Sequence, residues 1–168
     1  PAWTPDGKSI AFISNRGASG RGGEDDNKIY LMPADGSGPA RLLLHHTFGL
    51  WEAEISRDGQ WLVVRSDEAD GKSNLRGRRL QGDTTLVPLV VNKGGATFVS
   101  LSPDGHWLAY MSNESGRWDV FVRPVDRPGP RVQVSAAGGA VVAQGELEFL
   151  GPAALDADGA RRHAGGLA

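Results

Sequence analysis

The sequence of 168 residues contains no cysteine, which excludes a disulfide framework and any metal site built on thiolates. Oxidising and reducing compartments both tolerate this absence, so it does not locate the protein. No apolar run approaches the roughly 20 residues that a membrane-spanning helix needs, so we expect no membrane segment in this chain. The formal net charge is only −2 with both signs interspersed, which argues against a nucleic-acid partner and selects no other.

Helical periodicity is missing as well. No segment shows an apolar stripe at i, i+3, i+4 and i+7, and the 24 glycines and 10 prolines interrupt every candidate. The stretch 98–124 shows instead the period of two that a β-strand requires, with apolar residues on both faces of 107–111 and 120–122. The Pro-Asp-Gly at 103–105 and the Asn, Ser and Gly within 113–116 are typical of tight turns. The stretch therefore predicts a meander of three strands.

This unit occurs three times along the chain. Residues 1–15 align with 99–113, and 55–66 form a third copy. The Asp-Gly pairs of the turns are spaced 52 and 46 residues apart, at 6–7, 58–59 and 104–105. Repeats of this period are typical of propeller blades or of another stacked array. Each copy, with the segment after it, supplies four strands, which is the size of one blade.

We therefore predict an all-β fold, a partial β-propeller of about three four-stranded antiparallel blades plus a degenerate fourth. The blades are expected at 1–49, 50–95 and 96–139, and the degenerate fourth at 140–151, where the repeat signature has decayed. Residues 152–168 contain mainly Ala, Gly, Asp and Arg, so we expect a disordered tail. Because the chain opens in the middle of a repeat, we also expect it to be a piece of a longer protein.

One strand of the second blade is expected to be weak. Residues 74–81 carry three arginines and a central glycine where the other two blades have apolar runs. Such a strand buries less apolar surface, so we expect it to be frayed. Arg76, Arg78 and Arg79 are then predicted to be solvated on an edge strand rather than to bind nucleic acid, since no aromatic residues interleave them.

Motifs of catalysis and metal binding are weak. Gly-Lys-Ser at 71–73 matches only the end of a P-loop, and no helix is expected after it. The acidic run 24–27 lacks the ligand alternation of a calcium loop, and the adjacent His45 and His46 would point to opposite faces of a strand. The Gly-x-Ser-x-Gly spacing of a hydrolase nucleophile is also absent. We therefore expect no enzyme, no catalytic residue, no cofactor and no metal site.

The five tryptophans divide into two groups. Trp3, Trp61 and Trp107 flank the Asp-Gly turns, so we expect all three to pack within or between blades. The second group is Trp51, at the start of a strand, and Trp118, in a loop beside Arg117. An exposed Trp next to an Arg is a common hot-spot pairing. Trp118 and Arg117 are therefore the predicted binding residues.

The loops opposite the Asp-Gly turns vary in length and chemistry, as function-carrying loops on a rigid scaffold do. We predict that a protein or a small-molecule ligand binds on this loop face, formed by 15–27, 45–49, 67–73, 92–95 and 113–118. A partial ring also leaves the apolar faces of its end blades open, so self-association through them is expected.

The repeat points to a family. Trp-(Ser/Thr)-Pro-Asp-Gly-x-x-(Ile/Leu)-Ala-(Phe/Tyr)-x-Ser-Asn, present at 3–15 and at 101–113 with Leu101 in place of Trp, resembles the WD40-like (PD40) repeat of TolB-type β-propellers over roughly 1–136. The run 107–124, followed by 132–139, is similar to the propellers attached C-terminally to bacterial eukaryotic-like serine/threonine kinases. The second blade departs from the pattern, with Ile-Ser-Arg-Asp at 55–58.

The resemblance implies a non-catalytic binding or sensor module of a larger bacterial protein, such as a propeller-bearing serine/threonine kinase. It favours an extracytoplasmic, periplasmic location, while a cytoplasmic one stays open. The same repeat occurs in propellers that gate prolyl-oligopeptidase-type serine peptidases. A substrate-gating propeller whose catalytic domain is absent from this chain is therefore the alternative.

Overall fold

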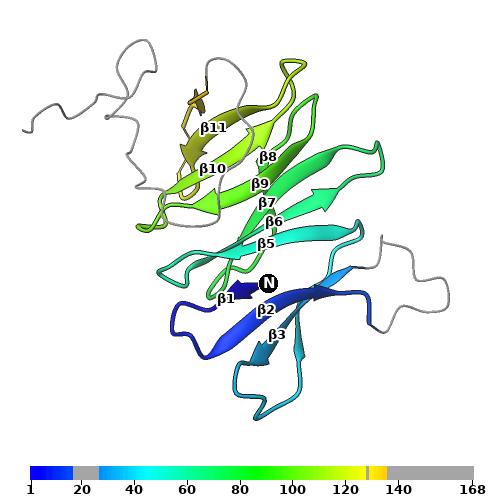
Figure 1. Cartoon of the computed structure of the whole chain (residues 1–168), viewed down its shortest axis with the longest axis vertical. Helices are drawn as coiled ribbons and strands as arrows, with labels where there is room; N and C mark the ends of the chain where they lie inside the picture. Colours follow the sequence, from blue (N-terminus) through cyan, green and yellow to red (C-terminus); the bar gives the residue numbers. More distant parts are fainter. Residues whose placement is uncertain (17–26, 128, 136–168) are drawn as a thin grey trace, which may run out of the picture.

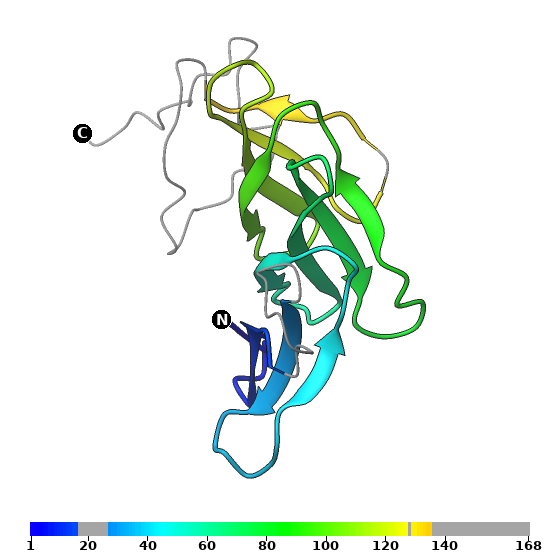
Figure 2. The same cartoon turned by 90° about the vertical axis from the view of Figure 1, so that its right-hand side faces the viewer.

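A computed structural model describes residues 1–16, 27–127 and 129–135. Within these ranges the chain forms twelve strands and no helix. The strands build three four-stranded antiparallel sheets, which are stacked in chain order (Figures 1 and 2). The prediction of an all-β fold with three four-stranded blades is confirmed. The degenerate fourth blade at 140–151, the tail at 152–168 and most of the acidic run 24–27 lie outside the described residues.

Each sheet keeps its strands in the order of the chain. The first, blade one, contains β1 (Ala2–Trp3), β2 (Ser9–Ser14), β3 (Lys28–Pro33) and β4 (Arg41–Leu44). Blade two contains β5 (Leu50–Ile55), β6 (Trp61–Asp67), β7 (Ser73–Arg79) and β8 (Val87–Val90). Blade three contains β9 (Ala96–Leu101), β10 (Trp107–Ser112), β11 (Asp119–Pro124) and β12 (Val132–Gln133).

The repeated Asp-Gly turn joins the first two strands of every blade through one set of contacts. In blade two the Ser56 hydroxyl donates to Asp58 Oδ1 at 2.5 Å and accepts from the Trp61 amide at 2.9 Å. Thr4 and Ser102 make the same pair of contacts in the other blades. The turn glycines have φ between 68° and 73°, a left-handed conformation that glycine adopts without steric cost. The turn sequence therefore fixes the register of each hairpin.

Residues at equal distances after each turn face the same neighbour. Three and five positions after the turn glycine stand Leu62 and Val64 in blade two, and Leu108 and Tyr110 in blade three. Both pairs pack against the preceding blade in an apolar cluster. The blades are thus held together by their faces, because each sheet alone is too thin to bury a core. The cluster between blades one and two contains Ala11, Ile29, Leu44, Leu50, Ile55, Leu62 and Val64.

The prediction of a frayed strand at 74–81 is wrong. β7 lies between β6 and β8 and pairs with β6 at all seven of its positions. It is stable there because Leu75 is fully buried and because Gly77 leaves room for the side chain of Leu89. The arginines are not simply solvated either, since Arg76 pairs with Glu68 at 2.8 Å and Arg78 donates to a backbone carbonyl of blade one at 3.3 Å.

The tryptophans of the turns differ in burial. Trp61 is buried, as predicted, and Trp107 is half-buried under the guanidinium of Arg127, 5.3 Å from its ring centroid. The prediction for Trp3 is wrong, because its side chain is 60% exposed. Trp3 occupies the repeat position of Ile55 and Leu101, which pack against the blade before their own. Within the residues that the structure describes, no sheet packs on this side of blade one, which leaves the ring of Trp3 exposed.

Candidate functional site

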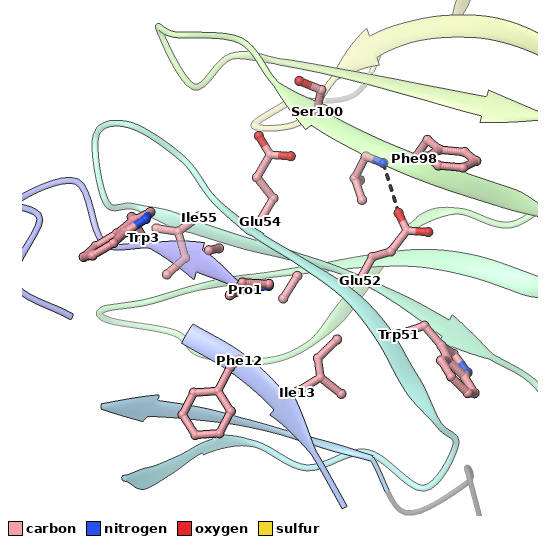
Figure 3. A pocket seen from close by; sticks show the side chains of 13 residues that line it. Pro1, Trp3, Phe12, Ile13, Trp51, Glu52, Glu54, Ile55, Phe98 and Ser100 are labelled. Atoms are coloured by element: carbon pink, nitrogen blue, oxygen red, sulfur yellow. Dashed lines mark hydrogen bonds between the residues drawn. The ribbon is translucent and has the colours of Figure 1, made fainter. Parts of the chain in front are cut away.

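A cavity of about 600 Å³ lies where the first strands of the three blades approach one another (Figure 3). These first strands, β1, β5 and β9, are the innermost strands of the blades, and β2 adds two residues to the wall. The lining residues are Pro1, Ala2, Trp3, Phe12, Ile13, Trp51, Glu52, Ala53, Glu54, Ile55, Phe98, Val99 and Ser100. The cavity is therefore built by all three blades and depends on how they pack.

Two irregular strands shape this cavity. The register of β5 shifts between Leu50 and Glu52, and that of β9 shifts opposite 109–111. At the second shift Phe98 has a φ of 53°, a left-handed conformation that a bulky residue rarely adopts. Bulges of this kind bend a strand and redirect its side chains, and they are frequent next to binding sites. Trp51 and Phe98 both line the cavity at these irregular positions.

Glu52 joins blades two and three. Its carboxylate pairs with Arg65 Nη1 at 3.0 Å, accepts a hydrogen bond from the Thr97 hydroxyl, and accepts one from the Val99 amide at 3.2 Å. The last of these contacts is drawn in Figure 3. Arg65 also donates to Thr97 at 3.2 Å, which closes the network. Glu52 thus has a cationic partner, which Arg65 also provides to Asp67 at 3.2 Å, and its role in the structure is to bridge two blades.

Glu54 lies two residues further along β5 and has a different environment. Its Oε1 accepts from the Leu101 amide at 2.8 Å, and no Lys, Arg or His pairs with it among the residues that the structure describes. Burial raises the pKa of Glu54 to about 7, and the negative charge of Glu52 raises it further, against the lowering effect of the Leu101 hydrogen bond. A carboxyl group in such surroundings exchanges its proton near neutral pH.

Comparison of the three repeats shows that the fold does not require this glutamate. Five positions before the turn glycine stand Ala2 in blade one, Glu54 in blade two and Ser100 in blade three. All three residues line the cavity, so the inner strand accepts a methyl, a hydroxyl or a carboxyl at this place. A partly buried charge without an ion-pair partner costs free energy. The inner strand therefore does not require Glu54, although its carboxyl group accepts the hydrogen bond from the Leu101 amide of blade three.

The remaining walls are aromatic. Trp3 and Phe98 are 60% and 56% exposed, an unusual degree for such large apolar side chains. Phe12 and Trp51 already have cations over their rings, with Arg16 at 5.0 Å and Arg65 at 5.8 Å from the centroids. The cavity thus combines exposed rings with one uncompensated carboxyl group, an arrangement suited to a partly apolar ligand.

The predicted binding residues lie elsewhere, in the turn between β10 and β11. Trp118 is 41% exposed and lies over the link between blades two and three, where a Cβ placed on Gly95 would be 3.7 Å from its ring. Arg117 pairs with the buried Asp119 at 3.2 Å. Neither residue lines the cavity of the inner strands. Their role as binding residues stays a prediction.

The weak motifs have structural roles. Lys72 pairs with Asp70 at 2.6 Å in a β-turn that leads directly into β7, without a helix. His46 accepts from the Phe48 amide at 3.3 Å in the link between blades one and two. Within the described ranges no three His, Cys, Asp or Glu side chains come together in a way that could hold a metal ion. No helix of the described chain is long and apolar enough to cross a membrane.

Sequence reasoning missed Glu52 and Glu54. Their signal was present in the repeat alignment, since two carboxylates alternate with apolar residues in the second copy where the first and third have Ala2, Phe98 and Ser100. Alternation places both side chains on one face of β5. The alignment does not show that this face lines a cavity, because the cavity depends on two other blades.

Comparison with known proteins agrees with the fold. No family model matches this chain. A TolB structure from Agrobacterium tumefaciens superposes with a TM-score of 0.63 at 23% identity, over 79% of this chain and 47% of that one. TolB from Acinetobacter baumannii gives 0.65 at 21% identity, over 82% and 32%. A prolyl endopeptidase gives 0.60 at 19% identity, over 81% and 21%. The chain thus has a TolB-like β-propeller fold.

Curated proteins are similar in sequence as well. Among them is a Bacillus subtilis protein named "Uncharacterized peptidase YuxL", which is 26% identical over 147 residues. The alignment covers 67% of this chain and 21% of the relative. The chain therefore spans about a fifth of the length of that protein.

Proposed function

We propose that this chain is a non-catalytic binding module, a propeller segment that holds a ligand between the inner strands of its blades. The observation that carries the proposal is the open cavity of about 600 Å³ lined by β1, β2, β5 and β9, with exposed aromatic rings and one carboxyl group that has no ion-pair partner in the described chain. A volume of this size is typical of sites for small molecules. Trp118 and Arg117 are proposed as a second contact on the loop face, for a protein partner.

Two settings in a longer protein are proposed. The first is the propeller of a bacterial serine/threonine kinase, which the repeat resemblance of 107–124 supports. The second is a substrate-gating propeller of a serine peptidase, which is supported by the name of the 26% identical relative and by the fold shared with a prolyl endopeptidase. In both settings the chemistry lies in another domain, and the propeller selects what reaches it.

Recovery of the complete reading frame separates the two settings. A kinase domain before the propeller supports sensing, and a hydrolase domain after it supports gating. A propeller with neither would contradict both.

The binding function itself is tested by a fragment screen followed by NMR of the isotope-labelled chain. We expect hits to shift the amide signals of 51–54 and 98–101. If the hits shift only the signals around Trp118, the binding site lies on the loop face instead of in the cavity. A screen in which no fragment shifts either group would overturn the proposed binding function.

A further inference from the structure

We propose that the cavity between the inner strands selects organic cations, with an ammonium group placed at Glu54 and its apolar body packed against an exposed aromatic ring of the lining. This inference rests on the proposed binding function and adds the chemical class of the ligand. It follows from the charge of the lining, from the comparison of the three repeats and from the exposed rings.

The charge of the lining residues determines whether a cation or an anion fits the cavity. Glu52 and Glu54 carry the two ionisable side chains of the lining, to which Pro1 adds its amino group. Glu52 pairs with Arg65 at 3.0 Å, a guanidinium that it shares with Asp67, and accepts from two further donors of β9. Glu54 accepts from one backbone donor and forms no ion pair with a cation of the described residues, the Pro1 amino group included. An anion would therefore meet an uncompensated carboxylate of its own sign, whereas a cation would complete an ion pair in partly desolvated surroundings, where such a pair is stronger than at the surface.

The repeat comparison explains why a function must be sought for Glu54. Ala2 and Ser100 show that the inner strand folds without a carboxylate at this position. Glu54 is partly buried, and no ion pair within the described chain offsets the loss of its hydration. A bound cation would recover part of it, since a charge partner offsets the desolvation of both groups. Ser100, on the neighbouring inner strand, offers a hydroxyl oxygen to the same ammonium group (Figure 3).

The aromatic rings of the lining indicate that the ligand also has an apolar part. Phe12 and Trp51 already have Arg16 and Arg65 over their faces. No such cation lies over Trp3 or Phe98 in the described residues, and both rings are more than half exposed at the cavity. An aromatic face attracts a cation and buries apolar area at the same time. The lining thus fits an amine carried on an apolar body rather than a bare metal ion, for which too few oxygen ligands converge.

Three probes of one shape test the selection. Phenethylammonium, 2-phenylethanol and phenylacetate share the same ring and chain and differ in charge. Each is titrated into the isotope-labelled protein at about pH 8, above the pKa of about 7 of Glu54, and the amide signals of 51–54 and 98–101 report binding at the cavity. We expect the ammonium to bind at least about tenfold more tightly than the alcohol, which corresponds to one ion pair of moderate strength, and the carboxylate to bind least.

Two variants assign the effect. Glu54→Gln keeps the shape of the side chain and removes its charge, so the preference for the ammonium over the alcohol should disappear. Glu114→Gln removes a carboxylate outside this cavity and should leave the preference unchanged. Trp3→Ala should weaken the ammonium and the alcohol together. Thermal unfolding of each variant verifies that it is folded.

The outcomes separate this inference from the binding function. If the alcohol and the carboxylate shift the cavity signals as strongly as the ammonium does, cation selection is wrong and the binding module stands. If the preference survives in Glu54→Gln, the assignment of Glu54 is wrong. If the ammonium shifts no cavity signal, the inference of cation selection is overturned. The binding function is then tested by the fragment screen alone.

Discussion

Glu54 gives the chain a pH dependence that ordinary carboxylates do not. Its pKa is about 7 in the fold against the usual 4.5, so the folded state holds a proton that the unfolded chain has lost. A raised pKa contributes stability that is fully present below pH 4.5 and is lost as the pH rises through about 7. Stability should therefore fall between weakly acidic and weakly alkaline pH.

The matching substitution removes that dependence. Glu54→Gln should raise the free energy of unfolding at about pH 8 by up to about 3 kcal/mol, since each pKa unit corresponds to about 1.4 kcal/mol. At about pH 5 the variant and the wild type should be nearly equal. Urea unfolding at both pH values measures this. The control is Asp35→Asn, because Ser37 lowers the pKa of the exposed Asp35 and this group does not titrate in the window.

A second residue-scale prediction concerns the turn hydroxyls. The Ser102 hydroxyl donates to Asp104 and accepts from the Trp107 amide at 2.9 Å, and the residue is almost fully buried. Ser102→Ala should lower the free energy of unfolding by about 1–3 kcal/mol, because it leaves buried polar groups without a partner. Thr4→Ala removes the same contacts in the more exposed first blade and should cost less. Equal shifts of the two urea midpoints would contradict this ranking.

The tryptophans give a third prediction, which the observed burial refines. Trp61→Ala deletes a buried ring and should cost about 3–5 kcal/mol. Trp107→Ala should cost less, because its ring is half-buried, and Trp118→Ala should change stability little. Denaturation midpoints of the three variants measure the order. A larger loss for Trp118 than for Trp61 would show that their structural roles have been assigned wrongly.

At the scale of elements, the link between blades two and three is a tight contact. Asn92 donates to the Ser112 hydroxyl at 2.9 Å, and the Gly95 amide donates to the side chain of Asn113 at 2.6 Å. A Cβ on Gly94 would lie 2.7 Å from the backbone nitrogen of Glu114, which leaves no room for a side chain. The link and the turn after β10 therefore hold each other in place.

Gly94→Ala tests this contact. We expect a loss of about 1–3 kcal/mol in the free energy of unfolding, as for other overpacked sites. Gly38→Ala is the control, because a Cβ there has an ordinary contact of 3.6 Å with Pro33 and the residue is not in a left-handed conformation. Thermal unfolding of both variants decides the matter, and equal melting temperatures would contradict it.

Elements were the part of the structure that local sequence signals could predict. The turn residues at 102–105 and the period of two fix the strands of each hairpin, and these are confirmed. The prediction for the third strand of blade two was wrong because the stability of this strand comes from contacts with other elements. Leu89 packs over Gly77, and Glu68 pairs with Arg76. Tertiary contacts of this kind override the propensity of a strand.

The candidate site could not be predicted from local sequence signals, because it too depends on contacts between elements. The face of Glu54 follows from alternation, but its burial depends on β9, whose Leu101 amide reaches it across the blade interface. The bulge at Phe98 could not be predicted from the sequence either, because no Gly, Asn or Asp occupies its left-handed position. A site made by three blades can be predicted once their packing is known.

At the scale of the whole molecule, the first blade presents an apolar face without a partner in the described chain. Ile10 and Phe12 occupy the repeat positions of Leu108 and Tyr110, which blade two covers. The ring pair Phe12–Tyr30 is stacked at 6.0 Å, as Tyr110–Phe121 is at 5.8 Å, yet the first pair is not fully buried. Leu42 on β4 is 53% exposed.

Such a face should bind other apolar surfaces. We expect the 168 residues to bind the dye ANS or to self-associate, because the exposed side chains of Trp3 and Leu42 offer apolar surface on which another apolar group can pack. A longer protein that supplies the neighbouring blades should be monomeric and more stable. Sedimentation and dye binding on both measure this. A compact, dye-silent monomer from the short chain would mean that the face is covered.

The hydrogen bonds from β9 to the two glutamates have a further consequence for folding in a crowded cell. A first strand of a blade has one free edge, and such an edge is a template on which another chain can add a strand. Here the Val99 and Leu101 amides of that edge are already engaged by Glu52 and Glu54. An incoming strand would have to displace both carboxylates and bring its own backbone beside their charge. The acidic pair thus protects the inner edge of blade three against intermolecular β-sheet growth.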